Sequence, residues 1–236
     1  MKQYLIMHRG TSSECIIASS LNKALCKEAD LTWVVSDPDH KQIFKHSNVS
    51  KILTPEEFVE LTGQGDYEKM IPLFVPDEGD EQNPEGPYRN MGSFSRYWDI
   101  LRGNKPSAMS LYQVYFNLAG VKWKGQGPDI QYYPKSKSRR SRVGIGIANA
   151  NLRRFVTDKV EFERLTPYFI PSKKNIYRRM NDINKSASII TDDHLTMTLA
   201  VYLRKYVYFL ETLPLNLRLE FFGNGCVYQV PADILR

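Results

Sequence analysis

The first 63 residues alternate short apolar runs with amphipathic stretches. The runs Gln3–His8, Leu31–Ser36 and Val49–Leu53 have the length and composition of buried strands. Between them, Glu14–Glu28 carries apolar side chains at helical spacing, "DPDHKQIFKH" begins as a polar helix, and "PEEFVELTG" is typical of a short helix. Strand, helix, strand, helix, strand at this spacing predicts a parallel α/β unit with right-handed crossovers.

A second α/β pattern fills the last third of the chain. It predicts the strand "RVGIGIA", the helix "TDKVEFERLTPYF", a polar stretch, the strand "ASIITDD", the helix "HLTMTLAVYL" and the strand "KYVYFLE". The middle of the chain differs, because "VPDEGDEQNPEGPYRNMGSF" is acidic and rich in Pro and Gly, as in a long surface loop. After it, "SAMSLYQVYFNLAGV" predicts a helix stopped by Gly120, and "PDIQYYP" predicts a short strand or extended segment.

The basic run "KSKSRRSR" separates the two patterns. We therefore predict an N-terminal α/β domain over 1–134, a basic linker over 135–142 and a C-terminal α/β domain over 143–236. Two such halves predict a ligand crevice between them, at the carboxyl ends of their strands.

Composition narrows the class of protein. With 236 residues, 42% hydrophobic and 25% charged, the chain is expected to fold around a packed core. No apolar run approaches about 18 residues, so no integral membrane segment is expected. The three cysteines show no C-x-x-C spacing, which indicates neither a disulfide framework nor a zinc knuckle and favours a reducing cytoplasm. Cys15 and Cys26 occupy apolar helix positions, where a thiol is usually a small core residue.

The charge and the common motifs limit the chemistry. A net charge of +6 favours an anionic partner such as nucleic acid, lipid A-type phosphates or a nucleotide diphosphate. The sequence has no phosphate-binding loop, no G-x-S-x-G and no paired-histidine spacing, and its four histidines are scattered, so no metal site is predicted. The two glycines of "VGIGIA" lie inside a strand, where tight packing is their ordinary meaning.

The first candidate site is the loop that opens the first helix. Gly10 is followed by three hydroxyl residues and then by Glu14. A carboxylate at a helix start is stabilised by free backbone N–H groups and the helix dipole, so Glu14 is either a capping residue or a catalytic base.

Two loops of the second half are further candidates. In "IANANLRRF", Arg153 and Arg154 lie near a helix start, where guanidinium groups suit phosphate oxygens, although adjacent arginines are more often a solvated pair. In "IITDDHLTM", a buried strand ends in Thr191, Asp192 and Asp193 before a helix. These residues are good N-caps, and the alternative is a helix N-terminus that receives a diphosphate.

These segments together resemble the heptosyltransferase-like glycosyltransferases. The resemblance rests on "YLIMHRGTSSECIIASSLNKALCKEADLTWVVSD", "YQVYFNLAGV", "RVGIGIANANLRRFVTDKVEFERL" and "SASIITDDHLTMTLAVYLRKYVYFL", which follow the family's order over most of the chain. It implies a GT-B-like α/β fold of two Rossmann-like halves facing a central crevice, with the second half shortened. The stretch between Tyr168 and Lys185 looks too short for the family's additional strand and helix there.

The resemblance also implies roles for individual residues. Glu14 holds the place of the family's catalytic Asp, Arg153 matches its phosphate-contacting Lys, and Met197 stands where a His is usual. The residues expected to bind the donor are Arg153, Arg154, Thr191, Asp192, Asp193 and His194. Those expected to bind the acceptor or sugar are His8, Arg9, Gly10, Thr11, Ser12 and Ser13.

The implied reaction is inverting and metal-independent, with no cofactor and a UDP- or ADP-linked sugar as co-substrate. The compact chain would suit a phage genome, which favours a hydroxymethylated DNA base as acceptor and host cytoplasm as location. Lipopolysaccharide core or another glycan is the alternative acceptor, and a non-catalytic nucleic-acid-binding protein on a degenerate GT-B fold is the alternative class. The residues expected to follow a DNA backbone are Lys135, Lys137, Arg139, Arg140 and Arg142.

Overall fold

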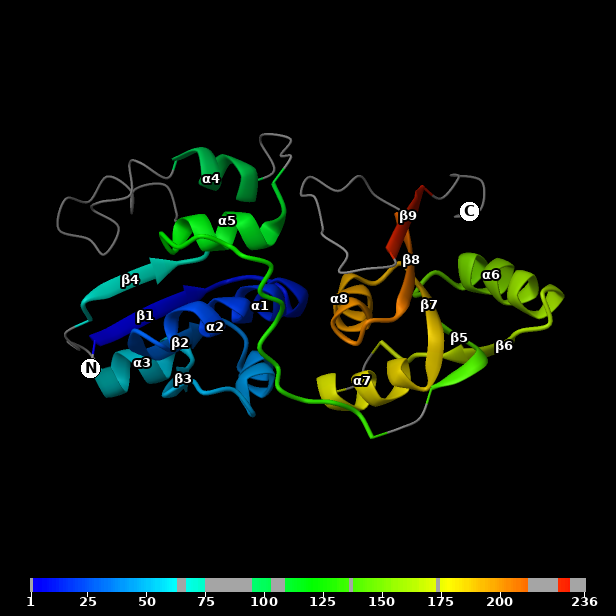
Figure 1. Ribbon diagram of the computed structural model, residues 1–236, viewed down its shortest axis with the longest axis horizontal. Helices are drawn as coiled ribbons and strands as arrows, with labels where there is room; N and C mark the ends of the chain where they lie inside the picture. Colours follow the sequence, from blue (N-terminus) through cyan, green and yellow to red (C-terminus); the bar gives the residue numbers. More distant parts are fainter. Residues whose placement is uncertain are drawn as a thin grey trace. The chain divides into compact units, whose positions relative to one another are not determined.

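A computed structural model describes residues 2–62, 67–74, 95–102, 109–135, 138–172, 175–211 and 225–229 (Figure 1). These residues form two compact units, the first ending at Gln131 and the second starting at Tyr132. The basic run expected as a linker over 135–142 lies within the second unit. The acidic segment 75–94 lies outside the described residues.

The first unit is a parallel sheet with helices around it. Its strands pair in the order β3-β2-β1-β4, all in parallel (Figure 1). In chain order the elements are β1 (Lys2–His8), α1 (Ser12–Ala18), the 3-10 turn η1 (Ser19–Leu21), α2 (Asn22–Leu25), β2 (Ala29–Val35), the 3-10 helix η2 (Pro38–Phe44), β3 (Lys51–Leu53), α3 (Pro55–Thr62), β4 (Lys69–Pro72), α4 (Ser95–Leu101) and α5 (Leu111–Leu118).

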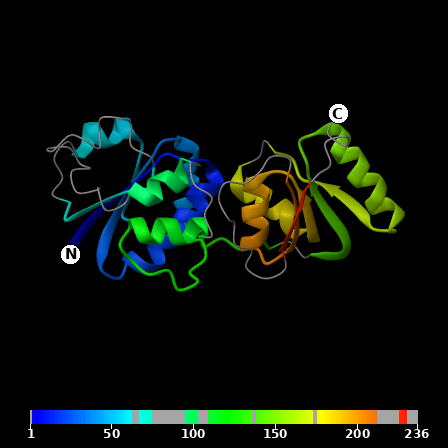
Figure 2. The same cartoon turned by 90° about the horizontal axis from the view of Figure 1, so that it is seen from above.

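The second unit is a parallel sheet in the order β6-β5-β7-β8-β9 (Figure 1). Figure 2 shows the same unit from above, with its described elements coloured from green to red. In chain order its elements are β5 (Arg139–Gly146), α6 (Ala150–Phe162), β6 (Thr166–Phe169), α7 (Ile176–Asn184), β7 (Ser186–Thr191), α8 (His194–Tyr202), β8 (Tyr206–Glu211) and β9 (Gly225–Gln229). Two all-parallel α/β sheets confirm the predicted fold class.

Three expectations for the second half were wrong. The helix predicted over 157–169 starts earlier, at Ala150, and ends at Phe162, while Thr166–Phe169 is the edge strand β6. The segment between this helix and the next strand, interpreted as a polar stretch, holds the helix α7, which was not predicted. Residues Arg139–Arg142, expected in the linker, form the first half of β5. In the first half, β4 was not predicted, whereas its other strands lie within two residues of their expected bounds.

Each unit has an apolar core of its own. In the first, Leu5, Val34 and Leu53 from three neighbouring strands pack together. In the second, the strand residues Val143 and Ile145 pack against α6 residues spaced four apart, namely Leu152, Val156 and Val160. This spacing places the three on one face of the helix and explains why α6 lies on the sheet.

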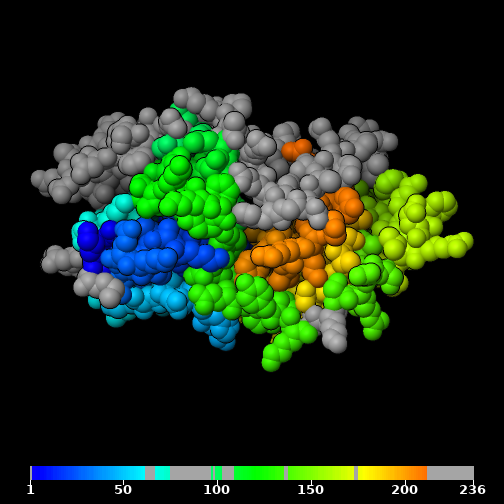
Figure 3. Space-filling view, viewed as in Figure 1, coloured from blue at the N-terminus to red at the C-terminus, as the bar shows by residue number. Residues whose placement is uncertain are grey.

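A buried polar network fixes the segment 119–131, which follows α5, to the helices of the first unit. The Trp33 indole donates to Asn22 Oδ1 (3.0 Å), and the Asn22 amide donates to Asp129 Oδ2 (3.3 Å). The Asp129 backbone N–H donates to Ser19 Oγ (2.9 Å). In the space-filling view this segment (green) lies against the blue N-terminal helices (Figure 3).

None of the helices among the described residues has the length and apolarity that crossing a bilayer requires.

Candidate functional site

The strand order of each sheet reverses beside its first strand. In the first sheet β1 lies between β2 and β4, and in the second β5 lies between β6 and β7. In open parallel sheets the loops that leave the carboxyl ends of the strands at such a switch point form the ligand site. The loops concerned are β1–α1 in the first unit, and β5–α6 and β7–α8 in the second, which are the three loops singled out from the sequence.

Glu14 closes the N-terminus of α1. Its Oε2 accepts from the Thr11 backbone N–H (2.6 Å) and from Thr11 Oγ1 (2.9 Å), while the Glu14 N–H donates to Thr11 Oγ1 (3.4 Å). This is a complete capping box, so the capping interpretation of Glu14 is confirmed. Among the described residues Oε1 accepts no hydrogen bond, so this half-buried carboxylate keeps one oxygen for another partner.

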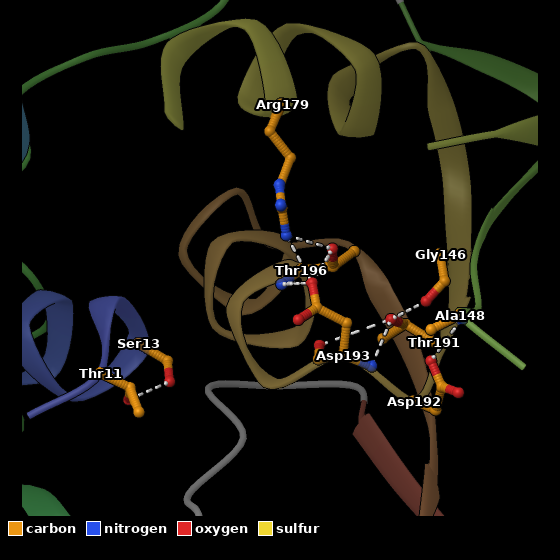
Figure 4. A network of polar contacts seen from close by, with 9 residues as sticks. All are labelled: Thr11, Ser13, Gly146, Ala148, Arg179, Thr191, Asp192, Asp193 and Thr196. Carbon is orange, nitrogen blue, oxygen red and sulfur yellow. Dashed lines mark hydrogen bonds and ion pairs between the residues drawn. The ribbon is translucent and has the colours of Figure 1, made fainter. Parts of the chain in front are cut away.

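The other residues of the β1–α1 loop differ in how far their side chains are exposed to solvent. Arg9 and Thr11 are exposed, and the Arg9 guanidinium lies 4.5 Å from the centre of the Phe74 ring. Ser13 is buried and its Oγ lies 3.1 Å from Thr11 Oγ1 (Figure 4). Ser12 Oγ lies 3.1 Å from His40 Nε2. Arg9 and Thr11 are therefore the residues of this loop that a ligand reaches most easily.

His8, expected to bind acceptor or sugar, points into the protein instead of toward solvent. Its side chain is almost fully buried, and neither ring nitrogen has a hydrogen-bond partner in the described part of the chain. Burial, with a smaller effect of the neighbouring His40, lowers the pKa of His8 to about 3, so the ring is neutral. The ligand atoms of His8, Cys15 and His40 all lie within 4.8 Å of one another, and all three residues are buried.

The two predicted donor loops of the second unit are tied together. The Ala148 backbone N–H donates to Asp192 Oδ1 (3.1 Å), and Thr191 Oγ1 donates to the Gly146 carbonyl (2.5 Å; Figure 4). A Cβ on Gly146 would lie only 3.0 Å from Thr191 Oγ1, so glycine permits this close approach. The tight-packing interpretation of the strand glycine is confirmed.

Asp193 caps α8 and binds a buried arginine. Its Oδ2 accepts from Thr196 N (2.9 Å), from Thr196 Oγ1 (2.6 Å) and from a terminal nitrogen of Arg179 (2.5 Å; Figure 4). The Arg179 side chain is only 5% exposed. Thr191 and Asp193 therefore shape the loop, and Asp192 joins it to its neighbour.

Arg179 was missed from the sequence because it lies in "NIYRRMNDIN", which was interpreted as a polar stretch. The apolar spacing of Ile176, Met180 and Ile183, all buried in α7, is the signal that would have found the helix.

Three cationic or titratable side chains near these loops face solvent. Arg153 and Arg154 are exposed in the second turn of α6, and an Arg153 terminal nitrogen donates weakly to the Ile147 carbonyl (3.4 Å). His194, the first residue of α8, is exposed, with its ring 5.0 Å from that of Phe209. These side chains are available to a ligand held at the ends of β5 and β7.

The basic run lies at the other end of the second sheet. Lys135, Arg139 and Arg140 are exposed, Arg142 stacks over the Tyr168 ring at 5.0 Å, and Lys137 lies outside the described residues. Arg139 begins β5, whereas the donor loop follows Gly146, so the two are separated by the length of the strand, about 23 Å at 3.3 Å per residue.

Comparison with solved structures places this arrangement in a known fold. No family model matches the sequence, and no curated protein aligns with it. The solved structures that the chain resembles include "glycosyl transferase family 9" from Veillonella parvula DSM 2008. It is 11% identical with a TM-score of 0.61, over 97% of this chain and 86% of that one.

The E. coli heptosyltransferase WaaC with ADP is 10% identical with a TM-score of 0.56, over 98% of this chain and 92% of that one. E. coli ADP-heptose lps heptosyltransferase II is 11% identical with a TM-score of 0.53, over 98% of this chain and 91% of that one.

The chain has a GT-B-like fold. At these sequence identities the likeness establishes the architecture, and the activity has to be argued from the site itself.

Proposed function

We propose that this protein is a glycosyltransferase that moves a sugar from a nucleotide-diphosphate sugar to an acceptor hydroxyl. The observation that carries the proposal is the position of the three predicted loops, each of which leaves a strand at the switch point of a GT-B-like sheet. Two of the solved neighbours are named with ADP or ADP-heptose, which makes ADP-heptose the first donor to test.

The second unit provides the donor site in this proposal. Within the described part of the chain, Asp193 accepts one N–H of the α8 backbone, that of Thr196, which leaves the N–H groups of His194 and Leu195 for phosphate oxygens. Arg153, Arg154 and His194 are exposed beside the same loops. A diphosphate leaving group gains negative charge as its bond to the sugar breaks, so these donors stabilise the transition state more than the ground state.

The first unit provides the base. The free Oε1 of Glu14 takes the proton of an acceptor hydroxyl, the hydroxyl oxygen forms a bond to the anomeric carbon, and the bond to the diphosphate breaks. Arg9 and Thr11, both exposed in the same loop, hold the acceptor or the sugar. The cap and the base role are compatible because they use different carboxylate oxygens.

For the acceptor, we propose a phosphorylated glycan of the lipopolysaccharide type ahead of DNA. One neighbour is named as an lps heptosyltransferase, and a net charge of +6 suits an anionic acceptor. Lys135, Arg139 and Arg140 are each exposed and suit a phosphate backbone, which makes a hydroxymethylated DNA base the second candidate. Their position at the opposite end of β5 from the donor loops places DNA second.

The Glu14→Gln variant tests the proposal. Glutamine retains the shape and the capping hydrogen bonds, as Gln113 does at the same position of the α5 capping box, but cannot accept the proton. We expect turnover to fall by roughly 10²–10⁴-fold, with nucleotide binding unchanged. Transfer would be followed by mass spectrometry, with ADP-heptose and a panel of other nucleotide sugars, on lipopolysaccharide core and on hydroxymethylcytosine DNA.

The matched control is Gln113→Glu, which exchanges the same two side chains in a capping box without a proposed catalytic role. It should leave transfer intact. The contrary result is a wild-type protein that is folded, transfers no sugar from any donor and binds DNA in a salt-dependent way. That result would contradict the proposal and favour a non-catalytic nucleic-acid-binding protein.

A further inference from the structure

Three side chains that commonly bind metals meet beneath the β1–α1 loop. His8 ends β1, Cys15 lies in the middle of α1, and His40 lies in η2. Their exposures are 1%, 0% and 3%, and their ligand atoms lie within 4.8 Å of one another. Although these residues are scattered in the sequence, which predicted no metal site, the fold brings them to one place.

Polar groups in this cluster lack the partners that buried groups normally have. Among the residues the structure describes, neither ring nitrogen of His8 has a hydrogen-bond partner. The same is true of His40 Nδ1. A buried neutral imidazole carries one N–H and one lone pair, and leaving both unpaired is unfavourable. A cation bound to the lone pairs removes part of this cost.

The second nitrogen of His40 has the surroundings of a metal-bound imidazole. Its Nε2 lies 3.1 Å from Ser12 Oγ and 3.8 Å from an Asp37 carboxylate oxygen. Histidines that bind a metal through one nitrogen usually donate the other N–H to an oxygen nearby, which fixes the ring and its tautomer. Ser12 and Asp37 are such partners.

We propose that His8, Cys15 and His40 form a binding site for one zinc ion. Two imidazoles and a thiolate are typical zinc ligands, and zinc accepts three protein ligands with water in the fourth tetrahedral position. Bonds of about 2.0 Å to nitrogen and 2.3 Å to sulfur put tetrahedral ligand atoms about 3.5 Å apart. The present spacing therefore needs closure by about an ångström, within reach of small side-chain rotations.

The ion would act on the structure of the first unit. It would cross-link the end of β1, the helix α1 and η2, and so fix the base of the loop that carries Glu14. The inference does not depend on the proposed function, because metal binding is measured without donor or acceptor.

The test uses the full chain, stripped with chelator and titrated with Co²⁺ and then Zn²⁺. Cobalt bound by Cys15 should give thiolate-to-metal charge-transfer absorption at one equivalent, and zinc should displace it. Cys15→Ser and His40→Gln should each weaken binding by at least about 100-fold, since loss of an outer-shell partner alone costs 10–100-fold. Ser12→Ala should weaken it by roughly 10-fold.

Cys26→Ser and His46→Gln are the matched controls. Cys26 is the half-buried second thiol of the same helical region, and His46 is exposed just after η2. Both variants should bind metal like wild type. The inference is overturned if stripped wild-type protein gives no charge-transfer band, or if binding survives in Cys15→Ser and is lost in Cys26→Ser. The wild-type cobalt spectrum decides even where a variant does not fold.

Discussion

Gly10 has no room for a side chain. A Cβ there would lie 2.6 Å from Glu14 Oε2 and 2.8 Å from His8 Cε1. The Glu14 carboxylate can give way only by leaving its cap, and the buried His8 ring would have to shift away from the loop. Glycine is therefore required by the two neighbours, and its position links the capped carboxylate to the buried imidazole.

We predict that Gly10→Ala lowers the free energy of unfolding by about 1–3 kcal/mol, the usual cost of overpacking. The measurement is urea unfolding followed by circular dichroism. Gly127→Ala is the control, because a Cβ there meets nothing within 4 Å, and it should change stability little. Equal stability of the two variants would contradict the prediction, because it would show that the loop accommodates a Cβ at position 10 at little cost.

The buried His8 makes stability depend on pH. Its pKa is about 3 in the folded chain, mainly because of burial, against about 6.5 when unfolded. Between these values the unfolded chain binds more protons than the folded one, so stability falls as pH falls below 6.5. The slope expected from one such group is about 1.4 kcal/mol per pH unit.

We predict that the urea midpoint of metal-stripped protein drops between pH 7 and pH 5.5, and that His8→Leu reduces this drop. His46→Leu removes an exposed imidazole and should retain the wild-type pH dependence. Parallel pH curves for wild type and His8→Leu would show that His8 is not the responsible group.

At the scale of elements, α6 and α8 begin in the same way but with different consequences. Asn149 caps α6 by accepting from Leu152 N, and Asp193 caps α8 by accepting from Thr196 N. Asp193 also holds a buried guanidinium, that of Arg179 from α7. The start of α8 is therefore an electrostatic junction between two helices.

We predict that Asp193→Ala costs about 3 kcal/mol of unfolding free energy, at the lower end for breaking a buried pair because Asp193 is one-third exposed. Asn149→Ala should cost about 1 kcal/mol, the value of a cap. Chemical denaturation of the two variants checks the difference. Similar losses would mean that Arg179 finds another partner or water once Asp193 is removed.

Secondary structure was predictable where apolar spacing and turn residues agreed. The alternation of β1, α1, β2 and β3 followed from the apolar runs. The strand β6 was misassigned because the apolar pattern of α6 continues into "TPYF", and the helix is ended by Arg164 at φ +57° without a glycine to signal it. Residues other than glycine adopt this conformation rarely, so composition gave no warning.

At the scale of the whole molecule, the order of the strands determines which loops lie at a switch point, where ligands bind in parallel sheets. The sequence identified three loops by residue type, and the parallel topology places each of them at a switch point. Contacts between distant residues were not predictable. Arg179 reaches Asp193 from another helix, and His8 at the end of β1 lies 6.4 Å, centre to centre, from the ring of His40 in η2. Local patterns carry no information about such pairs.

The two sheets are made from separate stretches of chain. The strands β1–β4 all lie within residues 2–72, and β5–β9 lie within 139–229. No strand of one sheet pairs with a strand of the other among the described residues. Each sheet therefore follows from its own part of the sequence, which is why the two α/β patterns were recognisable separately.

The Glu14 carboxylate couples the proposed proton transfer to the start of α1. If Oε1 takes a proton during transfer, the negative charge on Oε2 is lost as well, and the two hydrogen bonds from Thr11 weaken together. The first turn of α1 would then loosen once in each catalytic cycle and tighten again when the proton leaves. A spectroscopic probe near Thr11 would report turnover as a repeated fraying and re-forming of one helix end.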